Sequence, residues 1–314
     1  MHHPFRVLLA LALVATAGCS PPADVPPPTE MAESIEAVHD WVMENESALK
    51  EGNPARQLAT LDATLDLIAH RYGEKSVEMT QAVRDTGLML IGNDRYDLAE
   101  PYIQEALLLS RQVFGHDHRE TGYALHDLAV VRDKLRPETF SIAAEPLLVE
   151  AIAVRRRVLG LEHLETAGSE AALSKLLLAS WRRTSRDDPH SELLTQADQF
   201  AAHSLQVLER AYGNDQSEVR DLRYRQVEIA LAKQEYARAE SQAQDLIVKH
   251  RQPCNDIGSP QSAQQLRIAA LRGAGRDADA DAAEAARAKD ECSPIALLPE
   301  TMRAILEKAE RRSL

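Results

Sequence analysis

The sequence predicts an all-α protein, folded as an α-solenoid of about five to six antiparallel helix hairpins. One glycine recurs at the end of each Leu- and Ala-rich stretch, at Gly73, Gly115, Gly160 and Gly213. The first spacing is 42 residues, and the next two, 45 and 53, are the same period with insertions. Aromatic residues make up only 4% of the chain, and strand-like alternation is absent. A period of this size is typical of stacked helical units rather than of one closed globule.

Each period is expected to begin where one helix ends and the next starts. Glycine accepts a positive φ without strain and is therefore favoured just after a helix C-terminus. A glutamate follows each glycine by five residues, at Glu78, Glu120, Glu165 and Glu218. Negative charge is favourable in the first turn of a helix, and the Asp117–Glu120 and Asp215–Glu218 spacings predict capping boxes.

The second helix of each unit repeats in more detail. These helices are predicted near residues 54–72, 97–114, 143–159, 192–212, 236–250 and 278–290. An acidic residue recurs near their starts, at Glu100, Glu145, Asp198 and Glu240. Small residues follow six positions later, as at Ala106, Ala151 and Ser204, where we expect close helix approach. Tyr96 and Tyr236 precede two of these helices and are predicted to wedge between the paired helices.

A last helix is expected over residues 299–312, behind Pro299 at a helix-start position. Terminal units of a solenoid need a cap on their outer apolar side. We therefore expect this segment to cap the last hairpin.

The N-terminus has the pattern of a secretion signal. Arg6 precedes the apolar run Val7–Ala15, which is too short to span a bilayer. The following Thr16-Ala17-Gly18-Cys19 resembles the lipobox of bacterial lipoproteins, although that pattern prefers Leu, Val or Ile where Thr16 stands. The resemblance implies lipidation of Cys19 and cleavage before it, and Ser20 resembles an outer-membrane sorting signal.

An alternative is cleavage after Ala17 at the A-x-A pattern Ala15-Thr16-Ala17, which would release a soluble periplasmic protein. Residues 20–30 contain five prolines and predict an extended spacer of roughly 30 Å. Such a stiff spacer suits a membrane tether, so we favour the lipoprotein.

The two remaining cysteines, Cys254 and Cys292, lie 38 residues apart, close to one repeat. In an oxidising compartment this spacing predicts a disulfide that joins the last two hairpins. It would contribute about 2–4 kcal/mol.

The repeats resemble tetratricopeptide repeats of the 42-residue, kinesin-light-chain-like variety. The segments Leu125–Ala129 and Val83–Gly87 match the first-helix element of that pattern, and Gly115–His118 and Gly160–His163 match its closing loop. The resemblance implies a right-handed solenoid. We accordingly divide the chain into a signal peptide (1–18), a Pro-rich tether (19–30), a helical repeat domain (31–292) and a capping helix (293–314).

In tetratricopeptide domains the first helices line a groove that binds peptides. Carried onto this sequence, the resemblance implies a partner-binding set of Gln81, Arg84, Asp85, Tyr123, His126, Asp127, Asp133, Lys175, Tyr224, Arg225 and Glu228. Grooves of the family that clamp peptide carboxylates use Lys, Arg and Asn. Aspartates stand at the asparagine positions here, at Asp85 and Asp127, which argues against simple anion capture. A solvated helix face is the alternative for each residue.

Two further groups of residues are candidate sites. Residues Trp181–Pro189 are expected to form a lengthened connection, and its basic residues Arg182, Arg183 and Arg186 are a possible contact loop. A neutral insertion is the alternative. The histidines around residues 116–126 lack a recognised metal-ligand spacing, so we expect no metal and no cofactor.

Composition and motifs narrow the function. The net charge of −13 disfavours nucleic acid, whose phosphates need a basic surface. The chain lacks the common nucleophile, phosphate-loop and zinc-protease motifs, so we do not expect an enzyme. The sequence predicts a protein-interaction scaffold tethered to the bacterial envelope, in the outer membrane and facing the periplasm. The alternatives are a permanent subunit of an envelope assembly and a soluble periplasmic adaptor.

Overall fold

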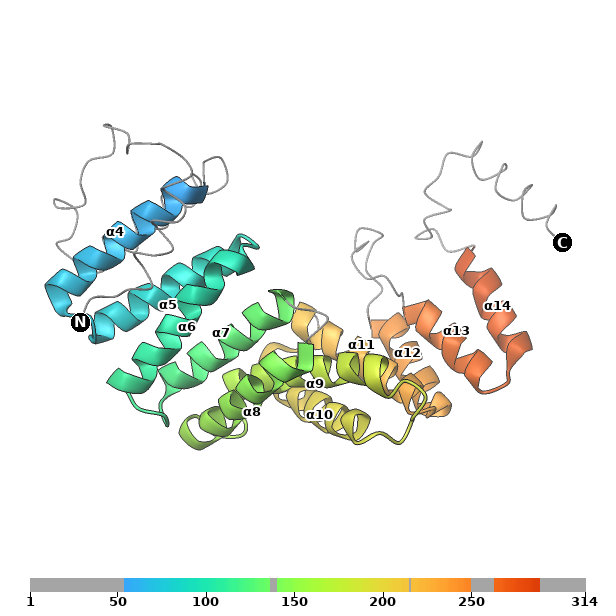
Figure 1. Ribbon diagram of the computed structural model, residues 1–314. Helices are drawn as coiled ribbons and strands as arrows, with labels where there is room; N and C mark the ends of the chain where they lie inside the picture. The colour runs from blue at the N-terminus through green and yellow to red at the C-terminus, as the bar shows by residue number, and fades with distance from the viewer. Residues whose placement is uncertain (1–53, 136–139, 215, 250–262, 289–314) are drawn as a thin grey trace, which may run out of the picture. The chain divides into compact units, whose positions relative to one another are not determined.

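The computed structural model describes residues 54–135, 140–214, 216–249 and 263–288, and these residues form eleven helices and no strand (Figure 1). The helices are α4 (Pro54–Tyr72), α5 (Val77–Gly92), α6 (Tyr96–Val113), α7 (Arg119–Leu135), α8 (Phe140–Val158), α9 (Leu164–Thr184), α10 (Glu192–Tyr212), α11 (Ser217–Ala232), α12 (Tyr236–Lys249), α13 (Ala263–Gly273) and α14 (Asp277–Ala288). Cys19, Cys254, Cys292 and residues 299–312 lie outside the described residues.

The helices group into two compact units, Met1–Leu159 and Gly160–Leu314, called unit 1 and unit 2 below. In unit 1, α5 packs on α6 and α7 packs on α8 as hairpins; in unit 2 the hairpins are α9 with α10, α11 with α12, and α13 with α14. The predicted all-α architecture of paired helices is confirmed. The even-numbered helices fall on the ranges predicted for second helices.

The glycines that set the period end helices as expected. Gly115 has φ 92° and Gly213 has φ 77°, in the left-handed region that a Cβ would strain. Beyond them, Glu120 and Glu218 lie in the first turns of α7 and α11. One glycine and one acidic residue therefore mark the boundary between successive hairpins.

The residue that caps two of the first helices differs from the prediction. The ring Nδ1 of His118 accepts a hydrogen bond from the main-chain N–H of Glu120 at 3.2 Å, and His163 does the same for Glu165. Asp117 instead pairs with Arg157 of α8. The predicted capping box at Asp117 is therefore wrong, and Asp215 lies outside the described residues.

Small residues allow the helices of each hairpin to approach closely. Ala106, Ala151 and Ser204 are completely buried, as the repeat pattern predicted. A Cβ on Gly87 would overlap Cδ1 of Ile103. Among the described residues, none of the helices has the length and hydropathy needed to cross a bilayer.

Three of the four recurring acidic residues of the second helices, Glu100, Asp198 and Glu240, join one hairpin to the next. Glu100 on α6 pairs with Arg132 on α7 at 3.2 Å. Asp198 on α10 accepts hydrogen bonds from Lys233 at 3.0 Å and Arg238 at 2.7 Å, both in the following hairpin. The sequence pattern identified these positions without their role, which is to link successive hairpins.

The two turn tyrosines also contact the next hairpin. The ring of Tyr236 fills the space beside Gly273 of α13, where a Cβ would overlap its Cε1 atom. Lys134, near the end of α7, places its Nζ 5.8 Å from the centroid of Tyr96. Each ring therefore lies against the end of the following first helix. The prediction placed these tyrosines between the two helices of one hairpin and did not include this contact with the next hairpin.

Candidate functional site

Three predicted site residues meet on the first helices of unit 1. Arg84 lies on α5, and Tyr123 and Asp127 lie on α7. The Nε–H of Arg84 donates to Oδ2 of Asp127 at 2.7 Å, and the side chain of Asp127 is only 11% exposed. The aspartate at the expected asparagine position thus binds an arginine of the preceding first helix. We call Gln81, Arg84, Asp85, Tyr123, His126 and Asp127 the unit 1 first-helix face.

The ring of Tyr123 lies near two guanidinium groups. Cζ of Arg84 is 5.0 Å from the ring centroid and Cζ of Arg155 is 5.1 Å from it. Both distances fall in the range of attractive cation–π contacts. Arg155 comes from the second helix α8 and is 2% exposed. It passes over Gly122, where a Cβ would lie 3.0 Å from its Cγ.

Arg155 was not among the predicted site residues, because resemblance to the repeat family placed the site on first helices alone. The signal was present as a run of three arginines, Arg155, Arg156 and Arg157, at the end of α8. On α7 the matching signal was Gly122, a glycine inside a helix.

His126 adds a neutral ring to this face. Burial lowers the pKa of His126 to about 3, and the positive charges of Arg155 and Arg84 act in the same direction. At neutral pH the imidazole is therefore uncharged, with one donor and one acceptor nitrogen. It therefore adds no third positive charge to the face.

Part of the face remains open to a partner. The two terminal amino groups of Arg84 have no acceptor among the described residues, and its side chain is 22% exposed. Gln81 and Asp85 are exposed on α5, and Asp133 is half-buried near the end of α7. The arrangement can donate hydrogen bonds from a guanidinium that its own aspartate and tyrosine hold in place.

The predicted residues of unit 2 do not form an equivalent cluster. The Nη1–H of Arg225 on α11 donates to the main-chain oxygen of Ala171 on α9 at 2.6 Å. Burial lowers the pKa of Arg225, and Asp221 and Glu228 oppose that change. Glu228 pairs with Arg182 at 3.2 Å. These groups link α9 to α11, so they are largely occupied by contacts within the protein.

The other two predicted residues of unit 2 are Lys175 and Tyr224. Lys175 is exposed on α9. Tyr224 is half-buried and packs against the hydrophobic core of the α11–α13 region.

The predicted contact loop is shorter than expected. Helix α9 continues to Thr184, so Arg182 and Arg183 lie in its last turn and only Arg186 lies in the connection. Trp181 is 8% exposed and its indole N–H donates to the main-chain oxygen of Asp188 at 2.8 Å. Basic residues near a helix C-terminus are favourable in their own right.

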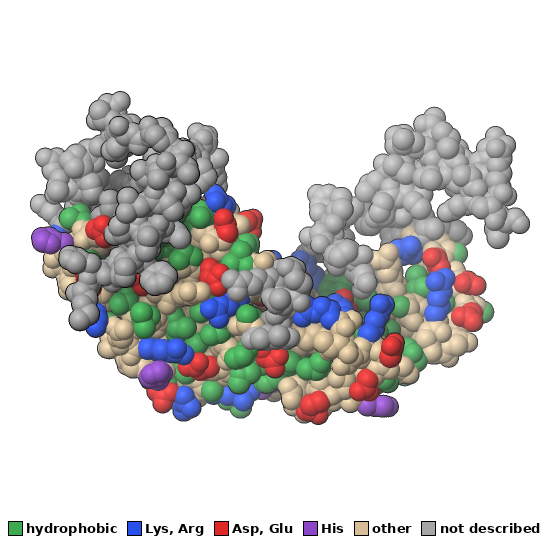
Figure 2. Space-filling model, in the orientation of Figure 1, with side chains coloured by type: hydrophobic (Ala, Val, Ile, Leu, Met, Phe, Trp, Pro, Cys, Tyr) green, Lys and Arg blue, Asp and Glu red, His purple; other side chains and the backbone are tan. Residues whose placement is uncertain are grey.

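The described residues hold no group of three or more His, Cys, Asp or Glu side chains that could bind a metal ion. His118 has its capping role instead, and its ring stacks on Phe114 with centroids 4.6 Å apart. On the face of the molecule that Figure 2 shows, acidic, basic and hydrophobic side chains are interspersed.

The comparisons with known proteins agree with this architecture. Two family models, both described as tetratricopeptide repeat, match residues 82–138 and 142–165. No curated protein sequence matches the chain. The crystal structure of BtubC (BKLC) from P. vanneervenii is similar at a TM-score of 0.56 and 14% identity, over 79% of this chain and 90% of that one.

Two crystal structures of kinesin light chain TPR-like repeats from Podosopora anserina, one of them of a variant with a single substitution, have TM-scores of 0.52 and 13% identity. They cover 68% of this chain and 96% or 97% of theirs. At these identities the structures show a shared fold, and the family models show the repeats. Tetratricopeptide repeats suggest a protein–protein interaction scaffold, and the fold is typically non-catalytic.

Proposed function

Because residues 82–138 and 142–165 match tetratricopeptide repeat models, we propose that the chain is a non-catalytic scaffold that binds a peptide segment of a partner protein on the unit 1 first-helix face. The observation that carries the proposal is the arginine pair around Tyr123. Asp127 and Tyr123 hold Arg84 in place while its terminal amino groups stay open. A held donor loses less side-chain entropy on binding than a free one does.

The chemistry of the face favours a main-chain or mixed contact over capture of a lone carboxylate. Asp127 offsets the charge of Arg84, and His126 is neutral. Asp85 adds negative charge at the exposed edge. A peptide carbonyl that accepts from Arg84, with an apolar side chain beside Tyr123, fits these groups best.

The proposed cellular setting rests on the N-terminal sequence. We propose that Cys19 carries a lipid and that residues 20–30 tether the repeats to the outer membrane on its periplasmic side. The alternative is cleavage after Ala17, which gives a soluble periplasmic adaptor. Metabolic labelling with a fatty acid distinguishes the two: the wild type is labelled and Cys19→Ser is not, whereas an unlabelled wild type overturns the tether.

Partner capture tests the binding face. Immobilised wild-type protein is expected to retain a discrete protein from extracts of the source cells, and Arg84→Glu is expected to lose it. The matched control is Gln104→Glu, which changes an exposed residue on the second helix α6. Equal capture by all three proteins would overturn the assignment of the face.

A second candidate function is a permanent subunit of a larger assembly. It is favoured by exposed large apolar side chains on the second helices of unit 1, Leu108 at 56% and Val149 at 52%. Light scattering of the protein isolated from its source cells separates the two functions. A monomer supports reversible docking, and a defined large species supports the subunit.

A further inference from the structure

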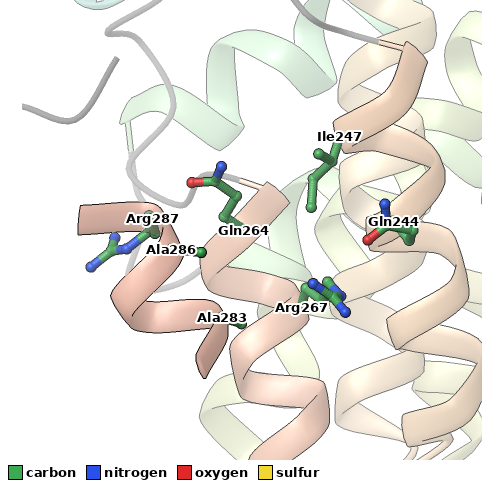
Figure 3. A pocket seen from close by; sticks show the side chains of 7 residues that line it. All are labelled: Gln244, Ile247, Gln264, Arg267, Ala283, Ala286 and Arg287. Atoms are coloured by element: carbon green, nitrogen blue, oxygen red, sulfur yellow. The ribbon is translucent and has the colours of Figure 1, made fainter. Parts of the chain in front are cut away.

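The last two hairpins of unit 2 enclose a hollow whose lining includes none of the predicted site residues. Its volume is about 360 Å³, which is within the range of small-molecule sites in proteins. The lining consists of Gln244 and Ile247 from α12, Gln264 and Arg267 from α13, and Ala283, Ala286 and Arg287 from α14 (Figure 3). Three helices of unit 2 therefore surround a space of the size that a small ligand needs.

The hollow is left open because α14 has few long side chains. Seven of its twelve residues are alanine. The turn residues with positive φ, Gln234 and Gly275, mark equivalent positions in the last two hairpins. The offset of 41 residues between them places Arg287 at the position of Leu246, which is 2% exposed on α12. Where the preceding second helix buries a leucine, α14 thus has a half-buried arginine beside unfilled space.

The two arginines of the lining differ in their partners. Within the part of the chain that the structure describes, Arg287 forms no ion pair, although Arg272 of the same hairpin pairs with Glu284. Figure 3 shows Arg287 at the outer edge of the lining set. Arg267 shares its charge with Glu240, whose Oε1 is 3.8 Å from its Nη2. Its Nε–H is buried without an acceptor among the same described residues. Arg287 is therefore the guanidinium that is open to a new counter-charge.

The composition of the lining favours a ligand with one negative charge and an apolar body. Ile247, Ala283 and Ala286 offer an apolar surface, and covering such a surface is stabilising in proportion to the area removed from water. A guanidinium binds a carboxylate through two parallel hydrogen bonds. Because Glu240 already offsets part of the charge of Arg267, a singly charged carboxylate suits the lining better than a doubly charged phosphate.

We propose that the hollow between α12, α13 and α14 binds a small amphipathic carboxylate. The carboxylate pairs with Arg287 at the outer edge, and the aliphatic part of the ligand covers Ile247, Ala283 and Ala286. The inference does not depend on the proposed function, because the hollow lies in unit 2 and the proposed partner face lies in unit 1.

Isothermal titration calorimetry of the full-length protein with sodium octanoate tests the site. The wild type is expected to bind one octanoate per chain with a Kd below about 1 mM, and Arg287→Gln is expected to weaken binding about tenfold or more. The control is Arg186→Gln, which changes an exposed arginine of unit 2 that does not line the hollow and should leave the Kd unchanged. No saturable binding to the wild type, or equal binding by Arg287→Gln, would overturn the proposal.

Filling the hollow tests where the aliphatic part lies. Ala286→Leu places a larger side chain in the space and is expected to abolish octanoate binding. Ala285→Leu changes the exposed neighbouring residue, which does not line the hollow, and should bind as the wild type does. Circular dichroism checks that both variants keep their helices. Full binding by a folded Ala286→Leu variant would show that the ligand lies elsewhere and would overturn the proposal.

Matched probes test the charge of the ligand. Octanol has the same carbon chain without a charge and is expected to bind about tenfold more weakly than octanoate, and octylammonium, with the opposite charge, should not bind. Equal binding of the three probes would indicate an apolar contact that ignores charge. Displacement of octanoate by an equal concentration of inorganic phosphate would indicate a site for bare anions. Either result overturns the assignment of an amphipathic carboxylate.

Discussion

The two units carry the same hairpins but use their first helices differently. In unit 1, Arg84 pairs with Asp127 on the next first helix and keeps its terminal amino groups open beside Tyr123. In unit 2, Arg225 donates to a main-chain oxygen, and Glu228 pairs with Arg182. In unit 2 these charged groups link helices to one another, whereas in unit 1 they belong to the face on which we propose that a partner binds.

In contrast to the first-helix faces, the contacts between successive hairpins are of the same kind in both units. An acidic residue near the start of a second helix binds a basic residue of the following hairpin in both units, as Glu100 and Asp198 show. The difference between the units teaches that the repeat pattern fixes how hairpins stack. The pattern does not fix the outward residues of the first helices, which differ between the two units.

The largest expected effect concerns the cysteines, which would distinguish unit 2 from unit 1. Cys254 follows the end of α12 at Lys249 by five residues, and Cys292 follows the end of α14 at Ala288 by four. A disulfide between them would raise the free energy of unfolding by about 2–4 kcal/mol. Mass spectrometry of non-reduced peptides should find the pair linked, and urea unfolding should shift on reduction. Two free thiols in protein isolated from its source cells would contradict the prediction.

The carboxylate that links two hairpins in unit 2, Asp198, should contribute more to the free energy of unfolding than its counterpart in unit 1, Glu100. Asp198→Ala removes hydrogen bonds to both Lys233 and Arg238, so we expect a loss of about 2–3 kcal/mol. Glu100→Ala loses the 3.2 Å pair to Arg132 and an exposed hydrogen bond from Gln104, and it is expected to cost about 1 kcal/mol. Urea unfolding followed by circular dichroism measures both, with Asp245→Ala, an exposed residue of α12, as the control. Equal losses would remove the distinction.

The pH dependence of the same link follows from the pKa of Asp198. Burial alone would raise this pKa, but the hydrogen bonds from Arg238 and Lys233 outweigh burial and lower it below the usual 3.8. A carboxyl whose pKa is lowered in the folded state stabilises the protein above its unfolded-state pKa. That stability is lost as the pH falls below about 4, so the difference between wild type and Asp198→Ala should shrink there.

A second pH response, in a higher range, is expected through His126 on α7 of unit 1. The pKa of His126 is about 3 in the folded protein, whereas an unfolded histidine titrates near 6.5. As the pH falls through 6.5, only the unfolded state takes up the proton, so the folded state loses about 2 kcal/mol between pH 7 and pH 5. His126→Gln should abolish this part of the slope, measured by urea unfolding at both pH values. An unchanged slope would contradict the assigned environment.

Two helix glycines give the smallest effects, and these have opposite signs. Gly87→Ala in unit 1 brings a Cβ into overlap with the buried Ile103, and such overpacking costs about 1–2 kcal/mol. Gly168→Ala in unit 2 meets nothing within 4 Å and should stabilise the helix by up to about 1 kcal/mol. Thermal unfolding of the two variants is expected to shift in opposite directions. Shifts of the same sign would show that packing around one glycine differs from this account.

The fold could be predicted from the sequence because the residues that repeat have strict local requirements. Gly115 needs its positive φ, and Ala106 and Ser204 are small where helices approach closely. The cap at His118 was not predicted, because histidine seldom serves as an N-cap and the nearby aspartate fitted a common motif. Local rules thus located the start of the helix but not the atom that accepts the hydrogen bond from its first turn.

Only part of the candidate site could be predicted from the sequence. Resemblance to the repeat family placed Arg84, Tyr123 and Asp127 on first helices, and the structure brings these three together. Arg155 could not be placed there, because its position depends on the room left by Gly122 on another helix. The extent of α9 was misjudged for a similar reason: buried Trp181 holds the helix end, and no local breaker marks the true boundary at Thr184.

Site-specific photo-crosslinking in the source cells tests the central claim, that the first helices of unit 1 hold the partner. A photoreactive residue at Gln81, exposed on α5, is compared with one at Gln104, exposed on α6. The account predicts a discrete protein adduct from position 81 and none from position 104. The same adduct from both positions, or from position 104 alone, would contradict it.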